Sequence, residues 1–460
     1  MLSNNNKANN ILKYRKIYFS GIGGISMSGL AEISHQMGAE VLGSDMTDSE
    51  NLIRLKKLGV TVHIPQVEKN ITPDIGLMVH TAAVKQDNPE IIAAKKLGIK
   101  TVERAEFLGL LMQCYKRPVC VSGTHGKTTI TSMLAEVMLK TNFNPTITVG
   151  GVLESIGGNI RIGGEDVFLM EACEYCNSFL QFNPYAAIIS NIEADHMDFF
   201  SNLDEIEQSF RAFAQKISPN GVLVINNSVK NLSKIVEGLA CKVITFGENG
   251  DYSYENLRFE SGFGAFDLLK GSQHIGSFKL STPGMHNVEN AMAAAALCHE
   301  LGVPCEDILA LNGFTGTKRR FEFKGKKNGA TIVDDYAHHP TEVKVALSAA
   351  KSYDTGRLWC VFQPHTYTRT KVFLNEFANA FTDCDKIIIT DIYAAREKDL
   401  GEVCAKDIAD KIEQLGKEVY YISKFEDIIK FLKDNLTNND MLITMGAGDV
   451  YLIGERLLLS

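Results

Sequence analysis

The sequence predicts an α/β protein of several domains, each built on a mainly parallel sheet. Short apolar runs alternate with segments of helical period over most of the chain, a pattern typical of strands that helices cover on both faces. Two of these runs enter glycine-rich turns that open a helix. The length of 460 residues exceeds what one hydrophobic core serves, and at roughly 150 residues per domain it suggests about three domains.

The first α/β unit is expected to end near Met112. A strand at Ile17–Ser20 leads through a glycine-rich turn into a helix that ends near Met37. Two further apolar runs, Val41–Gly43 and Leu77–His80, are expected as neighbouring strands. This alternation favours a parallel sheet.

A second unit begins with a strand at Pro118–Val121, and a third follows the basic turn Lys318–Arg320. Within the second unit, the glycine- and aromatic-rich stretch Tyr252–Gly276 is expected as a small appended antiparallel sheet. The Ala-rich run Asn290–Leu301 is expected as a helix. The other expected strands of these two units are Val167–Met170, Ala187–Ser190, Val222–Ile225, Leu358–Phe362, Lys386–Thr390 and Met441–Thr444.

The composition narrows the class of function. A net charge of −8 argues against a general binder of nucleic acid or of anionic membranes, because both need a concentrated basic surface. No apolar run approaches the roughly 18 residues of a membrane-spanning helix. The polar, Asn-rich start, Met1–Asn10, has no apolar secretory core. We therefore expect a cytoplasmic protein.

The ten cysteines are scattered and are expected to be reduced thiols. Cys173 and Cys176 have the spacing of a CxxC pair. A zinc site would need a second pair, and a redox site would need the pair to open a helix. We therefore interpret both residues as thiols of a pocket or a core.

The strongest motif lies between a strand and a helix of the second unit. It offers backbone N–H groups, a helix N-terminus, a lysine and a hydroxyl for Mg²⁺, which together form a phosphate-binding loop. The loop is shorter than a full Walker A motif, because Val121 stands where the first glycine belongs. Its residues, which we predict to bind nucleotide, are Gly123, Thr124, His125, Gly126, Lys127, Thr128 and Thr129.

Acidic residues follow two strands near this loop. Glu171 follows one strand, and the segment 191–198, which contains His196, follows another. Side chains at the carboxyl ends of parallel strands converge on the ligand crevice. Mg²⁺ prefers carboxylate, hydroxyl and phosphate oxygens, so Glu171 and Thr128 are predicted to hold one ion, and His196 is predicted to offer nitrogen to a second.

The turn after the first strand has a weaker pattern. Gly21, Gly23 and Gly24 nearly match GxGxxG, but Ser26 takes the place of the third glycine. Asp45 follows at the distance usual for an acid that contacts a ribose. On these residues alone, an NAD site, a UDP-sugar site and a purely structural tight turn remain equally acceptable.

Polar residues also gather in three later segments. One opens the Ala-rich helix, another follows the start of the third unit, and the last follows a strand of that unit. Six of the eleven histidines fall within the motifs named so far and these segments. The candidate site residues here are His286, Asn287, Asn290, Asp335, Tyr336, His338, His339, His365 and Arg369.

Taken together, these segments resemble the Mur ligase family, over nearly the whole chain from Tyr18 to Tyr451. The short loop GTHGKTT marks the wider family, which includes folylpolyglutamate synthases. The first glycine-rich run continues into Ser-Gly-Leu-Ala-Glu at 28–32, and DDYAHHPTE at 334–342 and GAGD at 446–449 follow later. These additions favour the members of the family that add L-alanine.

The resemblance implies three domains: an N-terminal Rossmann-like domain, 1–112, for the UDP substrate, a central P-loop mononucleotide-binding domain, 113–318, and a C-terminal Rossmann-like domain, 319–460, that closes over both. It implies ATP and Mg²⁺ as cofactors. The substrates would be UDP-N-acetylmuramic acid and L-alanine, joined through an acyl phosphate. No nucleic acid and no membrane span are expected, and the chain would be a monomer or a weak dimer.

Residue roles also follow from the resemblance. Lys127 would contact the ATP phosphates, while Thr128 and Glu171 would hold one magnesium ion and His196 the other. His286, Asn287 and Asn290 would lie against the nucleotide. Arg319 and Arg320, at the junction to the third domain, would reach substrate or phosphate.

The chain departs from the family at several positions. Many relatives have acids where Cys173 and Cys176 stand, and commonly an arginine where Thr366 stands. Sister ligases carry a carbamylated lysine near the position of Arg211, so no carbamate is expected here.

Three rival functions follow from the same motifs. The nearest is a family member that attaches a different amino acid or a preformed tripeptide. An NAD-dependent oxidoreductase would use the first glycine-rich turn but leaves GTHGKTT without a role. A non-catalytic nucleotide-switched scaffold would bind ATP and not turn it over with an amino acid.

Overall fold

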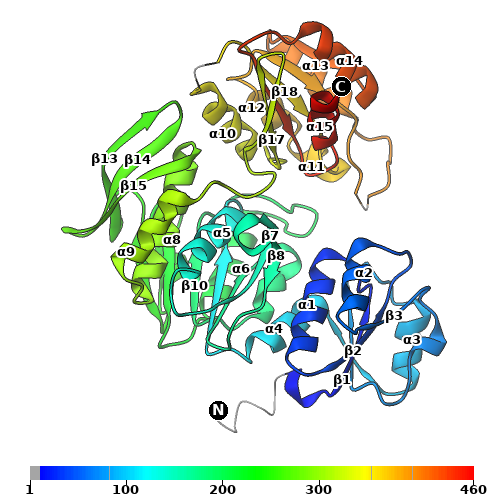
Figure 1. The fold of residues 1–460 in the computed structure, drawn as a ribbon. Helices are drawn as coiled ribbons and strands as arrows, with labels where there is room; N and C mark the ends of the chain where they lie inside the picture. The colour runs from blue at the N-terminus through cyan, green and yellow to red at the C-terminus, as the bar shows by residue number, and fades with distance from the viewer. Residues whose placement is uncertain (1–10, 82, 354, 396) are drawn as a thin grey trace.

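The protein is described by a computed structural model that covers residues 11–460, except 82, 354 and 396. The polar start, Met1–Asn10, therefore lies outside the described residues. Three sheets lie one after another along the chain, and helices cover them (Figure 1). The expectation of a three-domain α/β protein is confirmed. Within the described residues, no helix combines the length and the apolar character that crossing a bilayer requires.

The N-terminal sheet has five parallel strands in the order β3-β2-β1-β4-β5. Strand order reverses on either side of β1, and this is the point at which such folds bind ligands. The strands are β1 (Lys16–Ser20), β2 (Glu40–Ser44), β3 (Thr61–His63), β4 (Leu77–His80) and β5 (Lys100–Glu103). The helices are α1 (Ile25–Gln36), α2 (Glu50–Lys57), α3 (Pro89–Lys96) and α4 (Arg104–Met112).

The central sheet has ten strands in the order β15-β14-β13-β12-β11-β10-β6-β9-β7-β8. Its middle strands are parallel and fully buried apolar runs, because helices cover both faces. The strands are β6 (Arg117–Ser122), β7 (Thr146–Leu153), β8 (Gly158–Arg161), β9 (Val167–Glu171), β10 (Ala186–Ile189), β11 (Val222–Asn226), β12 (Lys242–Phe246), β13 (Tyr252–Glu260), β14 (Phe263–Lys270) and β15 (Gln273–Pro283). The helices are α5 (Lys127–Met138), α6 (Leu203–Ala214), α7 (Leu232–Val236), α8 (Met285–Glu300) and α9 (Cys305–Ile308), with a 3₁₀ helix η4 (Tyr175–Gln181).

The strands β13, β14 and β15 are antiparallel, as expected for the stretch 252–276. They do not form a separate small sheet, however. Phe246 of β12 pairs with Tyr252 of β13, so the three strands extend the main sheet at its edge. The short connection between these two residues explains the difference, because it leaves the chain beside the strand that it has just left.

The C-terminal sheet has six strands in the order β16-β17-β21-β18-β19-β20, with only β16 antiparallel to its neighbour. Two apolar clusters cover its two faces. The strands are β16 (Glu322–Lys327), β17 (Ala330–Asp335), β18 (Leu358–Phe362), β19 (Lys386–Ile389), β20 (Val419–Tyr421) and β21 (Met441–Met445). The helices are α10 (Pro340–Lys351), α11 (Tyr367–Val372), α12 (Leu374–Ala380), α13 (Ala405–Gln414), α14 (Phe425–Asn435) and α15 (Tyr451–Leu459).

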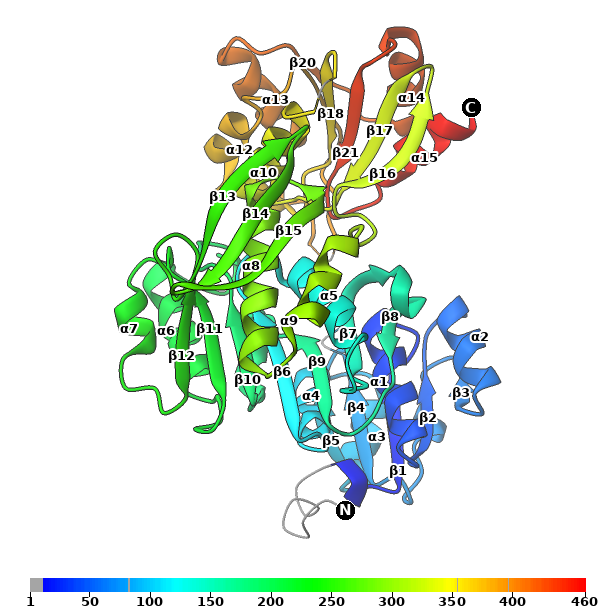
Figure 2. The same cartoon turned by 60° about the vertical axis from the view of Figure 1, so that its left-hand side comes forward.

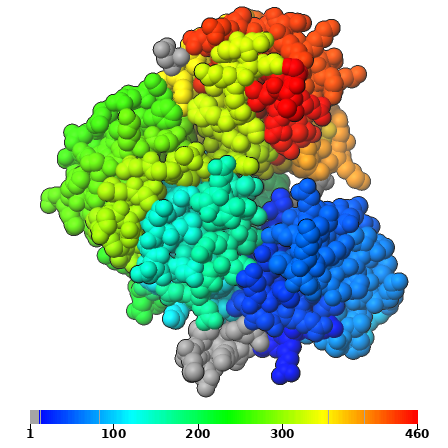
Figure 3. Space-filling model, in the orientation of Figure 1, coloured from blue at the N-terminus to red at the C-terminus, as the bar shows by residue number. Residues whose placement is uncertain are grey.

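The N-terminal and central sheets share one apolar cluster, which runs from Phe19 and Phe107 to Phe168 and Phe179. The hairpin of β7 and β8 lies beside α1 in both ribbon views (Figure 2). There the side chain of Ile160 packs so tightly on Gly29 that a Cβ at position 29 would lie 1.4 Å from its Cδ1. The surface is hollowed between the blue N-terminal part and the orange part of the C-terminal domain (Figure 3).

Candidate active site

The phosphate loop follows β6 and ends where α5 begins at Lys127. Gly126 has φ +84°, a left-handed conformation that glycine adopts without strain. A Cβ at Gly123 would lie 2.1 Å from the Ser190 hydroxyl, so this glycine permits a close approach to the loop after β10. From that loop the Asn191 amide oxygen accepts a hydrogen bond from the His125 N–H at 2.7 Å.

Lys127 lies inside the site rather than in solvent. Its ammonium donates to the Glu174 carboxylate at 3.0 Å and to the Thr124 carbonyl at 3.1 Å. Burial acts to lower the pKa of Lys127, but the charge and hydrogen bond of Glu174, together with the nearby Cys173 and Glu171, outweigh it and raise that pKa. The lysine is thus a fixed cation at the mouth of the loop. Glu174 itself is 2% exposed.

Thr128 and Glu171, the predicted magnesium ligands, contact each other. The Thr128 hydroxyl donates to Glu171 Oε2 at 3.2 Å, and the Gly150 N–H on β7 donates to Glu171 Oε1. A hydroxyl and a carboxylate are hard oxygen donors, which suits Mg²⁺. The donor set present here therefore fits the ion implied by the resemblance.

His196 lies near Glu174, the carboxylate that also accepts from Lys127. Its Nε2 is 3.8 Å from Glu174 Oε1 and 3.8 Å from Asp195 Oδ2. Burial lowers the pKa of His196, so the ring favours the neutral form that can ligate a metal. Its φ of +55° is uncommon for a residue with a side chain, and such strain concentrates at functional sites.

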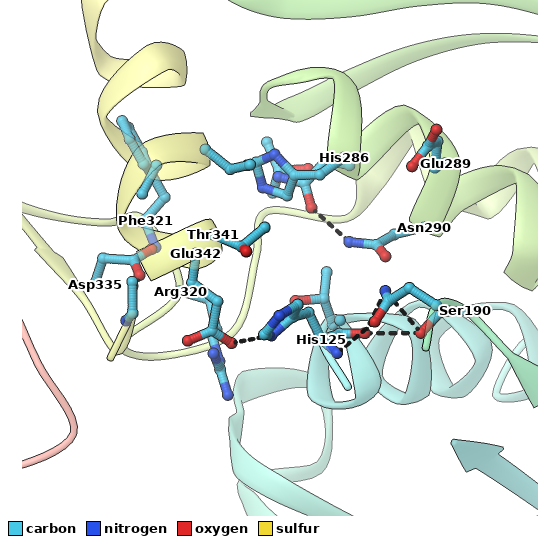
Figure 4. A pocket seen from close by; sticks show the side chains of 18 of the residues that line it. His125, Ser190, His286, Glu289, Asn290, Arg320, Phe321, Asp335, Thr341 and Glu342 are labelled. Atoms are coloured by element: carbon cyan, nitrogen blue, oxygen red, sulfur yellow. Dashed lines mark hydrogen bonds and ion pairs between the residues drawn. The ribbon is translucent and has the colours of Figure 1, made fainter. Parts of the chain in front are cut away.

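A cavity of about 260 Å³ opens between the phosphate loop, the start of α8 and the start of α10. Predicted ATP-site residues from the loop and from α8 line it, together with Arg320 at the domain junction. Figure 4 shows the side chains of His125 and Glu342 in contact at its edge. The predicted residues in its lining are His125, Gly126, Thr129, His286, Asn287, Asn290, Arg320 and Asp335. The predicted Gly123, Thr124, Lys127 and Thr128 lie in the loop beside it and do not line it.

His286 is buried in this cavity, and burial lowers its pKa to about 4, so the ring is neutral near pH 7. Its Nδ1 has no hydrogen-bond partner among the described residues. The Asn287 amide donates to the Pro283 carbonyl at 2.7 Å, and the Asn290 amide donates to Asn287 at 3.1 Å. These contacts leave the side-chain amide oxygen of Asn290 facing the phosphate loop. A Cβ at Gly126 would lie 2.7 Å from this oxygen.

The two junction arginines face different ways. The Arg319 guanidinium donates to the Asp334 carboxylate at 3.0 Å and to the Gly446 and Gly448 carbonyls at 2.7 and 3.0 Å. In this structure Arg319 ties the junction to its own domain, and its contact with substrate or phosphate stays a prediction. Arg320 lines the cavity, with Nη2 at 3.5 Å from the Thr128 hydroxyl.

The C-terminal candidates fall into two groups. Asp335 accepts N–H bonds from Phe321 and Ala337, while the Tyr336 ring packs under both junction arginines. Burial lowers the pKa of His338 to about 4, although the nearby Glu342 carboxylate acts to raise it. This group holds the junction and the start of α10.

The second group contacts the central domain directly. His339 Nε2 lies 3.1 Å from the Ala194 carbonyl, and Thr341 donates to Glu193 at 2.9 Å. Arg369 reaches Asp195 at 3.2 Å and lies 3.1 Å from His365 Nδ1. The C-terminal domain thus rests on the loop that carries His196.

The predicted UDP-site residues gather at the carboxyl ends of β1 and β2. Asp45 accepts the Gly23 N–H at 2.8 Å, which fixes the turn formed by Gly21, Gly23 and Gly24. Arg104 lies 3.4 Å from the Ser26 hydroxyl. This turn is more exposed than the phosphate loop.

Three carboxylates of the site were not among the predicted site residues. Glu174, Glu193 and Glu342 hold Lys127, Thr341 and His125 respectively. Beside the last two carboxylates, the pKa of His125 rises to about 9 even though burial opposes it. The DDYAHHPTE segment ends in Glu342, but its partner, His125, is 217 residues away in the sequence, so the pair could not be read from either motif.

The two cysteines and Arg211, at which the chain departs from the family pattern, have ordinary protein surroundings. Cys173 is half-buried and burial raises its pKa to about 11, while Cys176 is exposed. Neither belongs to a group of metal-ligating side chains within the described part of the chain. Arg211 donates to the carbonyls of Lys234 and Glu237 around α7.

Family comparisons agree with this architecture. The Mur ligase family catalytic domain matches residues 16–116, the Mur ligase middle domain matches residues 121–298, and the Mur ligase glutamate ligase domain matches residues 319–448. The chain belongs to the Mur ligase family. The sequence-based assignment to this family is confirmed.

Individual Mur ligases are similar over nearly the whole chain. A protein of Acetivibrio thermocellus named UDP-N-acetylmuramate–L-alanine ligase is 49% identical over 97% of this chain and 96% of its own. A protein of Lachnoclostridium phytofermentans with the same name is 50% identical over 96% of this chain and 97% of its own. The solved structure of the UDP-N-acetylmuramate-alanine ligase of Thermotoga maritima has a TM-score of 0.80 at 30% identity and covers 96% of this chain and 98% of its own. A murein peptide ligase of Psychrobacter arcticus has a TM-score of 0.71 at 25% identity, over 97% and 98%.

Proposed function

We propose that this Mur ligase joins L-alanine to the lactyl carboxylate of UDP-N-acetylmuramic acid, using ATP and releasing ADP and phosphate, in peptidoglycan precursor synthesis. One observation carries the proposal: identities of 49% and 50% over nearly full length to two ligases named for this reaction. The cavity beside a phosphate loop supports it, because a ligase of this kind must place ATP next to a second substrate.

The three domains would divide the work. Residues 113–318 would bind ATP, with the phosphates on the loop 123–129 and the base in the cavity beside Asn287 and Asn290. Residues 1–112 would bind the UDP moiety at the turn held by Asp45, and residues 319–460 would close over both. The hollow in the surface between the N-terminal and C-terminal domains supports this arrangement (Figure 3).

A magnesium ion would be held by Thr128 and Glu171, with the His196 imidazole available to a second ion. When bound, magnesium supplies positive charge that offsets the charge of the phosphoryl oxygens. Lys127 adds a cation that Glu174 and the Thr124 carbonyl keep in place. Arg320 adds another from the C-terminal side.

The chemistry would proceed in two steps. A carboxylate oxygen of the sugar attacks the γ-phosphorus of ATP, and the bond from that phosphorus to the β-phosphate oxygen breaks. The products of this step are an acyl phosphate and ADP. The neutral amine of L-alanine then attacks the carbonyl carbon, loses a proton, and the tetrahedral intermediate expels phosphate. Lys127 and Arg320 would stabilise the charge that develops on oxygen in both steps. No protein nucleophile takes part, so Cys173 and Cys176 need no catalytic role.

Residues of the C-terminal domain would place the amino acid. His365 and Arg369 lie next to Asp195 and the loop of His196, which brings them to the side where the amine must approach. His338 and His339 at the start of α10 would fix the closed position of this domain. The monomeric or weakly dimeric state and the cytoplasmic location stay predictions.

A coupled phosphate-release assay tests the function. The full chain is given ATP, Mg²⁺ and UDP-N-acetylmuramic acid, together with each of a panel of amino acids or the tripeptide L-alanyl-γ-D-glutamyl-meso-diaminopimelate. We expect turnover with L-alanine and little without an acceptor. Preference for the tripeptide or another amino acid would instead assign a sister activity, and turnover with no acceptor would favour a nucleotide switch.

Calorimetry separates the remaining rival. UDP-N-acetylmuramic acid is expected to bind to the chain, whereas NAD and NADH are not. We expect this because Ser26 replaces the third glycine of the GxGxxG pattern, and because the phosphate loop 123–129 offers a separate site for ATP. Tight NAD binding would reverse the assignment of the first glycine-rich turn.

A further inference from the structure

Three metal-ligating side chains meet where the central and C-terminal domains touch. His125 comes from the phosphate loop, Glu193 from the loop after β10, and His339 from the start of α10. One ligand atom from each lies within 4.8 Å of the other two. In the described ranges of the chain, no other three His, Cys, Asp or Glu side chains meet this closely.

One of the three ligand-atom distances matches that expected around a small tetrahedral ion. His125 Nε2 and Glu193 Oε2 are 3.5 Å apart. Two ligands at roughly 2.0–2.1 Å from zinc, at a tetrahedral angle, are separated by about 3.4 Å. The His125 Nε2 atom is buried, and despite this ion-pair distance it makes no hydrogen bond with good geometry among the described residues.

The rest of the His125 ring is already arranged as in metal sites. Its other nitrogen, Nδ1, lies 3.0 Å from Glu342 Oε1. Histidine ligands commonly donate their second ring N–H to a carboxylate, which fixes the tautomer and directs the free lone pair at the metal. Glu342 thus directs Nε2 toward Glu193. Figure 4 shows the His125–Glu342 contact.

His339 must give up one of its present contacts to bind an ion. Its ring centre is 4.9 Å from that of His125, and its Nε2 contacts the Ala194 carbonyl at 3.1 Å. A metal ion would replace either that contact or the Thr341 N–H bond at Nδ1. The competing occupant of the site is a proton on His125, shared between two carboxylates.

We propose that His125, Glu193 and His339 form a binding site for one divalent transition-metal ion of the zinc class, distinct from the magnesium site at Thr128 and Glu171. Two imidazoles and one carboxylate suit Zn²⁺ or Co²⁺ and not Mg²⁺, which prefers oxygen. Its ligands come from two domains, so the bound ion joins α10 to the phosphate loop. The fourth coordination position stays open to water.

Metal titration tests the site without relying on turnover, so its outcome is independent of the proposed function. The metal-free full chain, in excess Mg²⁺ and with and without ADP, is titrated with Zn²⁺ by calorimetry and with Co²⁺ by visible absorption. We expect one tight equivalent with the absorption of four-coordinate Co²⁺. Glu193→Gln and His339→Ala should each abolish it, and Glu342→Gln should weaken it about 10–100-fold.

Two control variants locate the ion. His196→Ala removes the imidazole near the magnesium site, and His274→Ala removes an exposed imidazole on β15; both should keep the tight equivalent. Circular dichroism verifies that each variant is folded, and Glu193→Gln, which preserves side-chain shape, is the decisive one.

The proposal is overturned if the wild type takes up no tight equivalent in either condition, which would leave the proton as occupant. It is also overturned if folded Glu193→Gln binds like the wild type, or if His196→Ala loses the ion.

Discussion

Two glycine-rich turns in this protein each follow a strand that has parallel neighbours on both sides, and each opens a helix, yet they have different surroundings. The first turn keeps its contacts within one domain, where Asp45 accepts the Gly23 N–H. The phosphate loop contacts a second domain, where Glu342 reaches His125. The difference teaches that a local glycine pattern specifies a backbone shape, whereas the ligand depends on what other elements bring to it.

The variant with the largest expected effect on this comparison is Lys127→Ala. We expect phosphate release to fall by roughly 10³-fold or more, because a cation that offsets phosphoryl charge is lost. The coupled assay measures it, and Lys140→Ala, an exposed lysine just beyond the same helix, is the matched control and should keep its activity. Near-normal turnover in a folded Lys127→Ala would remove the phosphate loop from the mechanism.

The cover over the phosphate loop should also respond to pH. Burial raises the pKa of Asp335 from 3.8 to about 6, although Arg320 and the N–H groups of Ala337 and Phe321 act to lower it. A folded pKa above the unfolded one means that this carboxyl contributes stability that is complete below about pH 4 and is lost as pH rises through about 6.

Urea unfolding at several pH values measures this effect. The free energy of unfolding of the wild type, relative to Asp335→Asn, should fall by about 2 kcal/mol between pH 4 and pH 7. Asp427→Asn, an exposed acid on α14, serves as the control and should give a difference that stays flat. A flat difference for Asp335→Asn as well would mean that its carboxyl is not protonated in the folded protein at low pH.

Asp45→Ala examines the first turn. Loss of the charge-assisted bond to the Gly23 N–H should raise the Kd of UDP-N-acetylmuramic acid about tenfold and leave the Kd of ADP unchanged. Calorimetry with both ligands checks this, and the exposed Asp48→Ala is the matched control. A parallel loss of ADP affinity would show that the two turns are not independent.

The smallest effect is expected for the double change Cys173→Ser and Cys176→Ser. Neither thiol belongs to the donor set at Thr128 and Glu171, so activity should stay within about twofold of the wild type. A bulky thiol reagent should still inhibit the wild type, because Cys173 lies next to Glu174. Loss of both activity and stoichiometric zinc in the double variant would establish a metal role for the pair.

Much of the fold was predictable because buried parallel strands are continuous apolar runs. The expected strand Leu77–His80 is β4 itself, and Leu358–Phe362 is β18. The hairpin of β7 and β8 was not anticipated. The alternation at the start of β7, Thr-Ile-Thr-Val, is broken by two adjacent glycines, and the four half-exposed residues of β8 carry no strand pattern.

The candidate site divides in the same way. Residues next to a strand end, such as Glu171, could be placed from sequence because the strand itself was evident. Arg319 and Arg320 could not be distinguished, since they are adjacent and alike. The positive φ of Arg319, +62°, turns its side chain toward Gly446, while Arg320 lines the cavity. Pairs such as His125 and Glu342 depend on how two domains meet, which no local pattern encodes.

The packing of Ile160 on Gly29 has a consequence for protein engineering. Because a Cβ at position 29 would lie 1.4 Å from the isoleucine Cδ1, the surface of α1 and the β7–β8 hairpin are shaped for each other. The same hairpin supplies the Gly150 N–H to Glu171. A chimera that takes its N-terminal domain from another Mur ligase should therefore exchange this hairpin together with it, although the two segments are far apart in the gene.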